Sequence, residues 1–204
     1  MSSNNDTQNK TATPVKVYLQ NYVRAETDFN MNQAINISKS IGKLGFLREI
    51  TPVTSNEQTV VRMNRDTLYG LGVFDLNCPV TIELPPNGGR YLSLYALDND
   101  QYSLALLHST KTESANITFN YPKADNNKCP KHVHYQESLW RRTKHVNSET
   151  RYIYVIIRIF VDPSNQTDVL EVNRLQDAVK VTQVNIGEWI WPNWDLKSLV
   201  QVRN

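Results

Sequence analysis

The segment RYIYVIIRIFV, residues 151–161, has the strongest strand pattern in the chain and decides the fold class. Successive side chains of a strand point to opposite faces of a sheet, so the two faces can be read separately. One face is aliphatic throughout, which predicts a strand over a core: Ile153, Val155, Ile157 and Ile159. The other face mixes aromatic, aliphatic and basic side chains: Tyr152, Tyr154, Ile156, Arg158 and Phe160. This mixed face needs an explanation of its own.

Residues 90–98 repeat this division into two faces. The aliphatic face carries Leu92, Leu94 and Ala96, and the mixed face carries Tyr91, Ser93, Tyr95 and Leu97. If both segments belong to one sheet, their mixed faces form a surface of rings and hydroxyls around one arginine. Such a surface suits a sugar or a small carboxylate, because tyrosine offers flat apolar area and arginine holds anions through paired hydrogen bonds. The alternative is that this face packs beneath an N-terminal helix, with its hydroxyls bonded to backbone groups.

Further strands are indicated by alternation of apolar and polar residues. This period of two recurs at 80–84 and 116–121. The sequence PPNGG at 85–89 is typical of a tight turn, and a strand begins at Arg90 directly after it. We therefore expect 80–84 and the following strand to form a hairpin.

Helical spacing occurs near both ends of the chain. The segment from Val15 to about Ile41 predicts one or two helices, and 168–182 predicts a late helix with Thr167 or Asp168 as its N-cap. The middle of the chain lacks the helices that a parallel α/β sheet needs between its strands. The sequence therefore predicts a mainly β fold, an antiparallel β-sandwich or jelly-roll.

Composition limits the classes of partner. The chain has 204 residues, enough for one domain with a sizeable core, and we expect a single β-rich domain over 14–204 after a disordered polar tail at 1–13. A net charge of +2 gives no reason to expect nucleic acid. No apolar run has the roughly 18 residues of a membrane span, and the start lacks the apolar stretch of a signal peptide. We expect an intracellular protein, and the abundant asparagine suits an AT-rich genome such as a viral one.

The segment VVRMNRDTLYGLGVFDL, residues 60–76, places Asn64, Arg65 and Asp66 among apolar residues. A lone buried charge is costly, so we expect this cluster to be at least partly buried and paired. As a structural staple, it would pair Arg65 or Arg90 with an acid, chosen from Asp66, Asp75 and Asp98. As a catalytic site, it would use Asp66 as acid or base and Arg65 as an anion clamp.

Other chemical motifs are weaker. His132, His134 and Glu137 are similar to part of a cupin metal site, but their spacing is too short and the second cupin motif is missing, so we predict no metal and no cofactor. Cys78 and Cys129 could pair. The tryptophans of NIGEWIWPNWDLKSLV, residues 185–200, fit either a core-closing terminus or a surface that stacks on sugars.

The segment at 60–76, together with GGRYLSLYALDNDQY at 88–102, RYIYVIIRIFVD at 151–162 and NRLQDAVKV at 173–181, resembles the family called domain of unknown function 1254. The resemblance spans about residues 16–182 and implies a β-rich fold but no particular chemistry. Members of that family commonly carry a secretion signal and a companion domain of unknown function, 1214. Neither is visible in this sequence, so we expect a stand-alone version whose uncovered apolar surface forms a homo-oligomer or joins a larger assembly.

Two functional hypotheses follow. In the first, the chain is a ligand-binding or structural assembly module that takes a small molecule or carbohydrate. In the second, it is an enzyme that acts on a small polar substrate, a carbohydrate or ester, through the cluster at 64–66. The candidate catalytic residues are Asp66 and Arg65. The candidate ligand-binding residues are Asn64, Tyr69, Arg90, Tyr91, Tyr95, Asp98, Tyr154 and Arg158.

Overall fold

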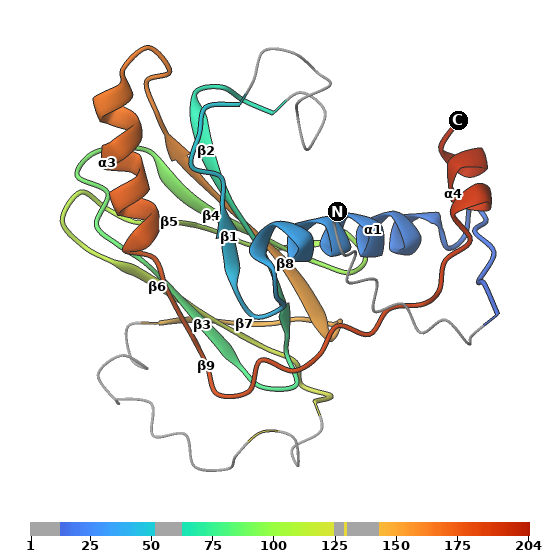
Figure 1. Ribbon diagram of the computed structural model, residues 1–204. Coiled ribbons are helices and arrows are strands. Elements are labelled where there is room, and N and C mark those ends of the chain that lie inside the picture. Colours follow the sequence, from blue (N-terminus) through green and yellow to red (C-terminus); the bar gives the residue numbers. More distant parts are fainter. Residues whose placement is uncertain (1–12, 52–62, 125–128, 130–142) are drawn as a thin grey trace.

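Two sheets form the body of the computed structural model, which describes residues 13–51, 63–124, 129 and 143–204 (Figure 1). The larger sheet has five strands in the order β1-β2-β8-β4-β5, and every neighbouring pair is antiparallel. Its strands are β1 (Leu44–Phe46), β2 (Thr67–Asp75), β8 (Tyr152–Phe160), β4 (Leu92–Asp98) and β5 (Ser103–His108). The two segments with mixed faces, β8 and β4, are neighbours in this sheet, as the sequence analysis required.

The smaller sheet has four strands in the order β7-β6-β3-β9. Its strands are β7 (Lys144–Asn147), β6 (Ala115–Asn120), β3 (Val80–Leu84) and β9 (Lys180–Gln183). Strands β6 and β7 are parallel, and the other pairs are antiparallel. The aliphatic faces of both sheets share one core, in which Ile82, Leu94 and Ile157 are fully buried. The prediction of a mainly β, sandwich-like fold with an N-terminal and a late helix is confirmed.

The predicted hairpin between 80–84 and the next strand is wrong. Strand β3 pairs with β6 and β9, whereas β4 pairs with β5 and β8 in the other sheet. Pro85 and Pro86 follow β3 directly and have no backbone N–H to extend its ladder. The chain therefore crosses from one sheet to the other over 85–91, where Gly88 and Gly89 adopt positive φ angles of 64° and 94°. Both strands contribute buried side chains to the main core.

Helix α1 (Tyr22–Ser38) lies on the outer face of the five-stranded sheet. The expected helical segment is a single helix that begins later than Val15, and its buried side includes Met31 and Ala34. Gly45 of β1 allows the close approach, because a Cβ there would lie 2.6 Å from the backbone of Ser38. The sheet and α1 therefore bury a second, smaller apolar cluster outside the main core.

The late helix is α3 (Gln166–Asp177), and its Val169 and Val172 complete the main core. Its N-cap is Asn165, whose side chain accepts hydrogen bonds from the backbone N–H groups of Thr167 and Asp168. The expected caps were therefore misplaced by two or three residues. Asn165 has the extended backbone that a capping residue needs, and Thr167 and Asp168 already belong to the first helical turn.

A further helix, α4 (Leu196–Arg203), was not predicted. It packs on the start of α1, and together these elements project from the sheets (Figure 1). We call residues 13–29 and 191–204 the arm. Its small core holds Val17, Ala25, Trp194 and Leu199. The tryptophans of the C-terminal segment thus close apolar clusters, since Trp189 also packs edge-on against Tyr152 at 4.8 Å between ring centroids.

Several expectations concern residues that are not described. The polar tail at 1–13 lies almost wholly outside the described residues, as do His132, His134 and Glu137. Cys78 and Cys129 are both free thiols, and the neighbouring thiol of Cys129 contributes to a raised pKa of Cys78. Within the described ranges, no helix is long and apolar enough to span a bilayer.

Candidate ligand-binding site

Helix α1 covers only part of the outer face of the five-stranded sheet. Met31 and Ala34 pack over Leu71, Val73 and the neighbouring end of β8. Further along the strands, the face is open and forms a pocket of about 540 Å³. The lining residues are Met63, Tyr69, Leu71, Tyr91, Ser93, Tyr95, Leu106, Tyr154, Ile156 and Arg158. One part of the mixed face therefore packs beneath α1, as the alternative interpretation expected, and the other part is open.

The strand register arranges the pocket floor in two rows. In the first row, Arg158 of β8 lies between Tyr69 of β2 and Ser93 of β4. In the second row, Ile156 lies between Leu71 and Tyr95, and Leu106 of β5 pairs with Tyr95. The first row is polar and carries a positive charge, while the second is mainly apolar. The floor thus changes from cationic to apolar along the strand direction.

Arg158 and Tyr69 are in direct contact at the cationic end. The Arg158 Nη2 donates a hydrogen bond to the Tyr69 Oη at 3.3 Å, and the guanidinium carbon lies 5.3 Å from the centre of the tyrosine ring. The backbone N–H of Asn64 also donates to the Tyr69 Oη, at 3.2 Å. Tyr69 accepts two hydrogen bonds, and its own proton has no acceptor among the described residues. This proton is available to a ligand.

Arg158 has no carboxylate partner among the described residues, which distinguishes it from most other described arginines. Among the described arginines, only Arg65 and Arg158 have no acidic side chain within salt-bridge distance. The others form pairs with acids: Arg24–Asp100, Arg48–Asp177, Arg90–Asp168, Arg151–Asp75, Arg174–Glu171 and Arg203–Glu26. Arg158 is also the only charged side chain among the described residues that line the pocket. Among the described lining residues, no acid therefore offsets the positive charge of Arg158.

The remaining polar groups of the pocket are hydroxyls. Burial raises the pKa of Tyr154 to about 12, so this hydroxyl keeps its proton at physiological pH and can donate it. Tyr91 is 47% exposed at the margin and packs against His108, with 5.6 Å between the ring centroids. The Ser93 Oγ has no hydrogen-bond partner among the described residues although Ser93 is buried. These groups give the pocket several donors around an apolar floor.

The cluster at 64–66 lies outside this pocket and is exposed, so the expectation of burial is wrong. Strand β2 begins at Thr67, immediately after the cluster, and the charged side chains therefore remain in solvent. The Arg65 Nε donates to the backbone carbonyl of Thr51 at 3.0 Å. The Asp66 carboxylate has no hydrogen-bond partner among the described residues. The geometry does not bring Asp66 and Arg65 together with the pocket.

The expected ion pairs between Arg65 or Arg90 and Asp66, Asp75 or Asp98 are also wrong. Asp75 is fully buried and forms a bidentate pair with Arg151, at 2.8 Å to Nε and 2.6 Å to Nη2. These hydrogen bonds raise the pKa of Arg151 further above its ordinary value. Asp75 also accepts the backbone N–H groups of Asn77 and Glu188. The structural staple exists, but Asp75 and Arg151 form it.

Two further ligand-binding candidates have structural roles. Arg90 binds Asp168 through both its terminal nitrogens and the carbonyl of Phe160 at 2.8 Å. Asp98 is buried and accepts the backbone N–H groups of Asp100 and Tyr102 in the turn after β4. Asn64 contributes only its backbone N–H, to Tyr69. The candidates that line the pocket are Tyr69, Tyr91, Tyr95, Tyr154 and Arg158.

Comparison with protein families gives one match over most of the chain. The model described as "Protein of unknown function (DUF1254)" matches residues 45–183. The chain belongs to this family. All the lining residues of the pocket fall inside the matched region, so the pocket is part of the DUF1254 portion of the fold. Helix α1 and the arm lie outside it.

One solved structure supports the fold. The VPA0106 protein from Vibrio parahaemolyticus is similar with a TM-score of 0.58 and 18% identity, over 86% of this chain and 41% of that one. An uncharacterised protein from Burkholderia cenocepacia gives a TM-score of 0.42 and 16% identity, over 89% of this chain and 44% of that one. This chain thus spans less than half the length of either protein. A search of curated proteins found no match.

Sequence reasoning missed part of the lining of this DUF1254 pocket. Met63, Leu71 and Leu106 were not candidates, and Ser93 and Ile156 were placed on the right face without a binding role. Leu106 was missed because SLALLH, the sequence of β5, lacks the alternation that marks a half-buried strand. Within the described ranges, no group of His, Cys, Asp and Glu side chains is arranged to hold a metal.

Proposed function

We propose that this protein binds a small organic molecule in the pocket on the outer face of the five-stranded sheet. The observation that carries the proposal is the uncovered part of that face, where Tyr69, Ser93 and Arg158 keep unused hydrogen-bonding capacity. A pocket of about 540 Å³ lies within the range of small-molecule sites, which is roughly 300–1,000 Å³. An apolar floor with a few convergent polar groups is the usual composition of such sites.

A pocket-filling substitution tests this function. Leu106 lines the pocket and is 56% exposed, so Leu106→Trp places a large ring in the cavity without disturbing the main core. The matched control is Leu170→Trp, because Leu170 is 54% exposed on α3, outside the pocket. A thermal-shift screen of small organic molecules is run on the wild type first. A ligand at 100 times its dissociation constant adds about 2.7 kcal/mol to the unfolding free energy.

We expect stabilising molecules to lose their effect on Leu106→Trp and to keep it on Leu170→Trp. The proposal fails if the two variants respond alike, because the molecules would then bind somewhere else. It also fails if a broad screen of neutral and charged molecules produces no stabilisation of the wild type.

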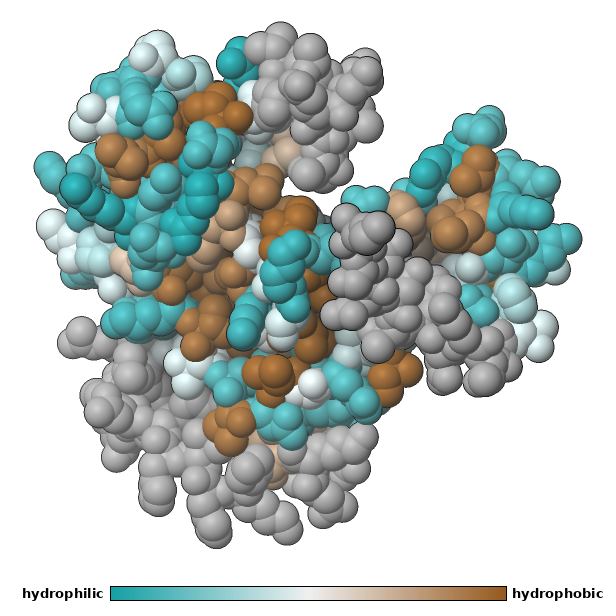
Figure 2. Space-filling model, viewed as in Figure 1, coloured by the Kyte–Doolittle hydropathy of each residue, from teal (hydrophilic) through white to brown (hydrophobic). Residues whose placement is uncertain are grey.

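Assembly through the arm is a second candidate role. Apolar side chains stand exposed on the arm, and Figure 2 shows apolar surface there. Their exposed fractions are Val15 39%, Tyr18 52%, Leu19 80%, Val23 50%, Leu196 49% and Val200 49%. Contiguous exposed apolar surface often marks a protein interface. We propose that a second copy of the chain covers this surface.

Sedimentation of the wild type and of the double variant Leu19→Glu/Val200→Glu tests self-association. We expect the wild type to form an oligomer at high micromolar concentration and the double variant to be monomeric. The control is Leu170→Glu, which adds a charge to a leucine on α3 that is 54% exposed and lies outside the arm. A monomeric wild type excludes self-association.

A further inference from the structure

The cationic end of the pocket contains two hydrogen-bond donors that lie side by side, Tyr69 and Arg158. The Tyr69 Oη lies 3.3 Å from the Arg158 Nη2, and Tyr69 already accepts hydrogen bonds from Arg158 and from the backbone of Asn64. Because both acceptor positions of the hydroxyl are used, its proton points elsewhere. The guanidinium of Arg158 keeps further N–H groups that no described acceptor takes. One anionic group with two oxygens can bind both donors.

The charge of the pocket matches a single negative charge. Arg158 is the only charged residue in the described lining of the pocket, and most of the other described arginines are neutralised by an acid. The guanidinium of an arginine forms two strong parallel hydrogen bonds with a planar carboxylate. A phosphate dianion carries two negative charges, and the single guanidinium of Arg158 can compensate only one of them. A carboxylate therefore fits the cationic end better than a phosphate does.

The second row of the floor determines which chemical group can occupy the rest of the pocket. Leu71, Ile156 and Leu106 offer only aliphatic surface, which cannot satisfy the hydroxyls of a sugar. Tyr95 and Tyr154 add ring area with a polar tip. A flat or compact hydrocarbon ring buries apolar area on this floor and brings no hydroxyl of its own that needs a partner there.

We infer that the pocket recognises a monocarboxylate with a hydrocarbon ring, held by Arg158 and Tyr69 at the carboxylate and by the apolar floor at the ring. The inference rests on the proposed binding function and specifies its ligand class. In this arrangement, Arg158 supplies the charge and Tyr69 a second donor. The apolar row selects against small inorganic anions and against sugars.

The test compares each acid with its neutral amide by isothermal titration calorimetry. The probes are benzoate, benzamide, cyclohexanecarboxylate, cyclohexanecarboxamide, inorganic phosphate and glucose. Hydrogen bonds to charged groups contribute about 1.5–3 kcal/mol, which corresponds to roughly 10- to 150-fold in affinity. We expect each carboxylate to bind at least tenfold more tightly than its amide, and phosphate and glucose not to bind.

Substitutions then assign the preference to particular residues. Arg158→Gln is expected to remove the difference between acid and amide, and Tyr69→Phe to weaken only the acid, by several-fold. The control is Arg174→Gln, which removes an exposed arginine on α3 and leaves the pocket unchanged. Circular dichroism melting of each variant shows whether it is folded, and Arg158 is exposed, so its loss costs little stability.

Each remaining result has a definite meaning. Equal affinity of acid and amide for the wild type overturns the carboxylate inference and leaves the binding function standing. An acid preference that survives in Arg158→Gln also overturns it. Binding of phosphate or glucose in place of the carboxylates assigns the pocket to another ligand class. If Leu106→Trp retains the affinity of the wild type for these acids, they bind outside the pocket and the proposed function itself fails.

Discussion

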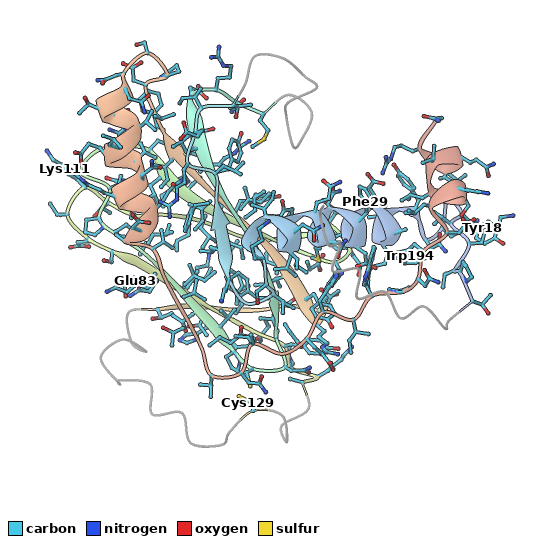
Figure 3. The ribbon with its side chains drawn as sticks, in the orientation of Figure 1. Tyr18, Phe29, Glu83, Lys111, Cys129 and Trp194 are labelled. Atoms are coloured by element: carbon cyan, nitrogen blue, oxygen red, sulfur yellow. The ribbon has the colours of Figure 1, made fainter. Side chains whose placement is uncertain are left out.

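Asp28 of α1 accepts a hydrogen bond from the indole nitrogen of Trp194, at 3.0 Å, and this contact joins residues 166 positions apart in the chain. The other carboxylate oxygen accepts the side-chain amide of Asn99 at 2.8 Å, so Asp28 ties α1 both to the C-terminal segment and to the turn after β4. Figure 3 shows Trp194 next to α1. Asp28 is only 3% exposed, and burial raises the pKa of its carboxyl group to about 6.

This raised pKa predicts a pH dependence of stability. The folded protein binds the Asp28 proton more tightly than the unfolded chain, whose pKa is close to 3.9. The stabilisation is complete below about pH 4 and is lost as the pH rises through about 6. Two pKa units correspond to about 3 kcal/mol. Asp28→Asn removes this dependence.

Urea unfolding at several pH values between 4 and 7 measures the effect. Other carboxylates contribute equally to wild type and variant, so the difference between their unfolding free energies isolates Asp28. We expect the variant to gain stability relative to the wild type as the pH rises. A difference that stays constant over this range contradicts the prediction.

The buried pair of Asp75 and Arg151 predicts a large loss of stability in Asp75→Asn. Removing one partner of a buried pair costs about 3–5 kcal/mol, and here two backbone N–H groups also lose a charged acceptor. The control is Asp100→Asn, which breaks the exposed pair with Arg24 and is expected to cost less than about 1 kcal/mol. Urea unfolding of both variants at pH 7 compares them. Similar small losses would show that the Asp75 pair does not stabilise the fold.

Asp66→Asn is expected to be neutral. The side chain is exposed and has no hydrogen-bond partner among the described residues, so the change should alter the unfolding free energy by less than about 0.5 kcal/mol. Affinity for any molecule that binds the pocket should also stay the same. Calorimetric melting and titration measure both quantities. Loss of binding without loss of stability would restore Asp66 as a site residue.

The two thiols are expected to react at different rates. Burial and the neighbouring thiol of Cys129 raise the pKa of Cys78 to about 12, and Cys78 is only 1% exposed. Cys129, which Figure 3 labels, is partly exposed. Because the thiolate is the reactive form, a disulfide reagent at pH 8 should label Cys129 first and Cys78 only as the protein unfolds. Cys129→Ser should remove the fast phase. Two equal rates in the native wild type would contradict this.

Local patterns in the sequence correctly predicted which side chains of one strand lie on the same face. Alternation along 90–98 and 151–161 placed Tyr95, Tyr154 and Arg158 on one face, and the sheet brings these faces together. The alternation within a strand does not reveal which distant strand pairs with it. The turn at 85–89 predicted a reversal of the chain, but the hydrogen-bonded partners of β3 come from β6 and β9.

Burial of charges was equally hard to predict from neighbours in the sequence. Apolar residues around Asp66 suggested that it was buried, yet it lies just before the first residue of β2. Asp75, within the same segment, is the buried acid, and its partner Arg151 is 76 positions away. Which of two nearby acids enters the interior depends on where the strand begins and on a partner that sequence spacing does not reveal.

The central position of β8 in the five-stranded sheet has a consequence for biosynthesis. Thr67 of β2 is paired with Phe160, so the two strands that flank β8 emerge from the ribosome well before the strand that joins them. Until then, β2 and β4 present open edges, which are prone to wrong pairing and aggregation. Pairings between such distant segments also make folding slow. The edges of β2 and β4 that β8 covers therefore stay open in a nascent chain until its last quarter is translated.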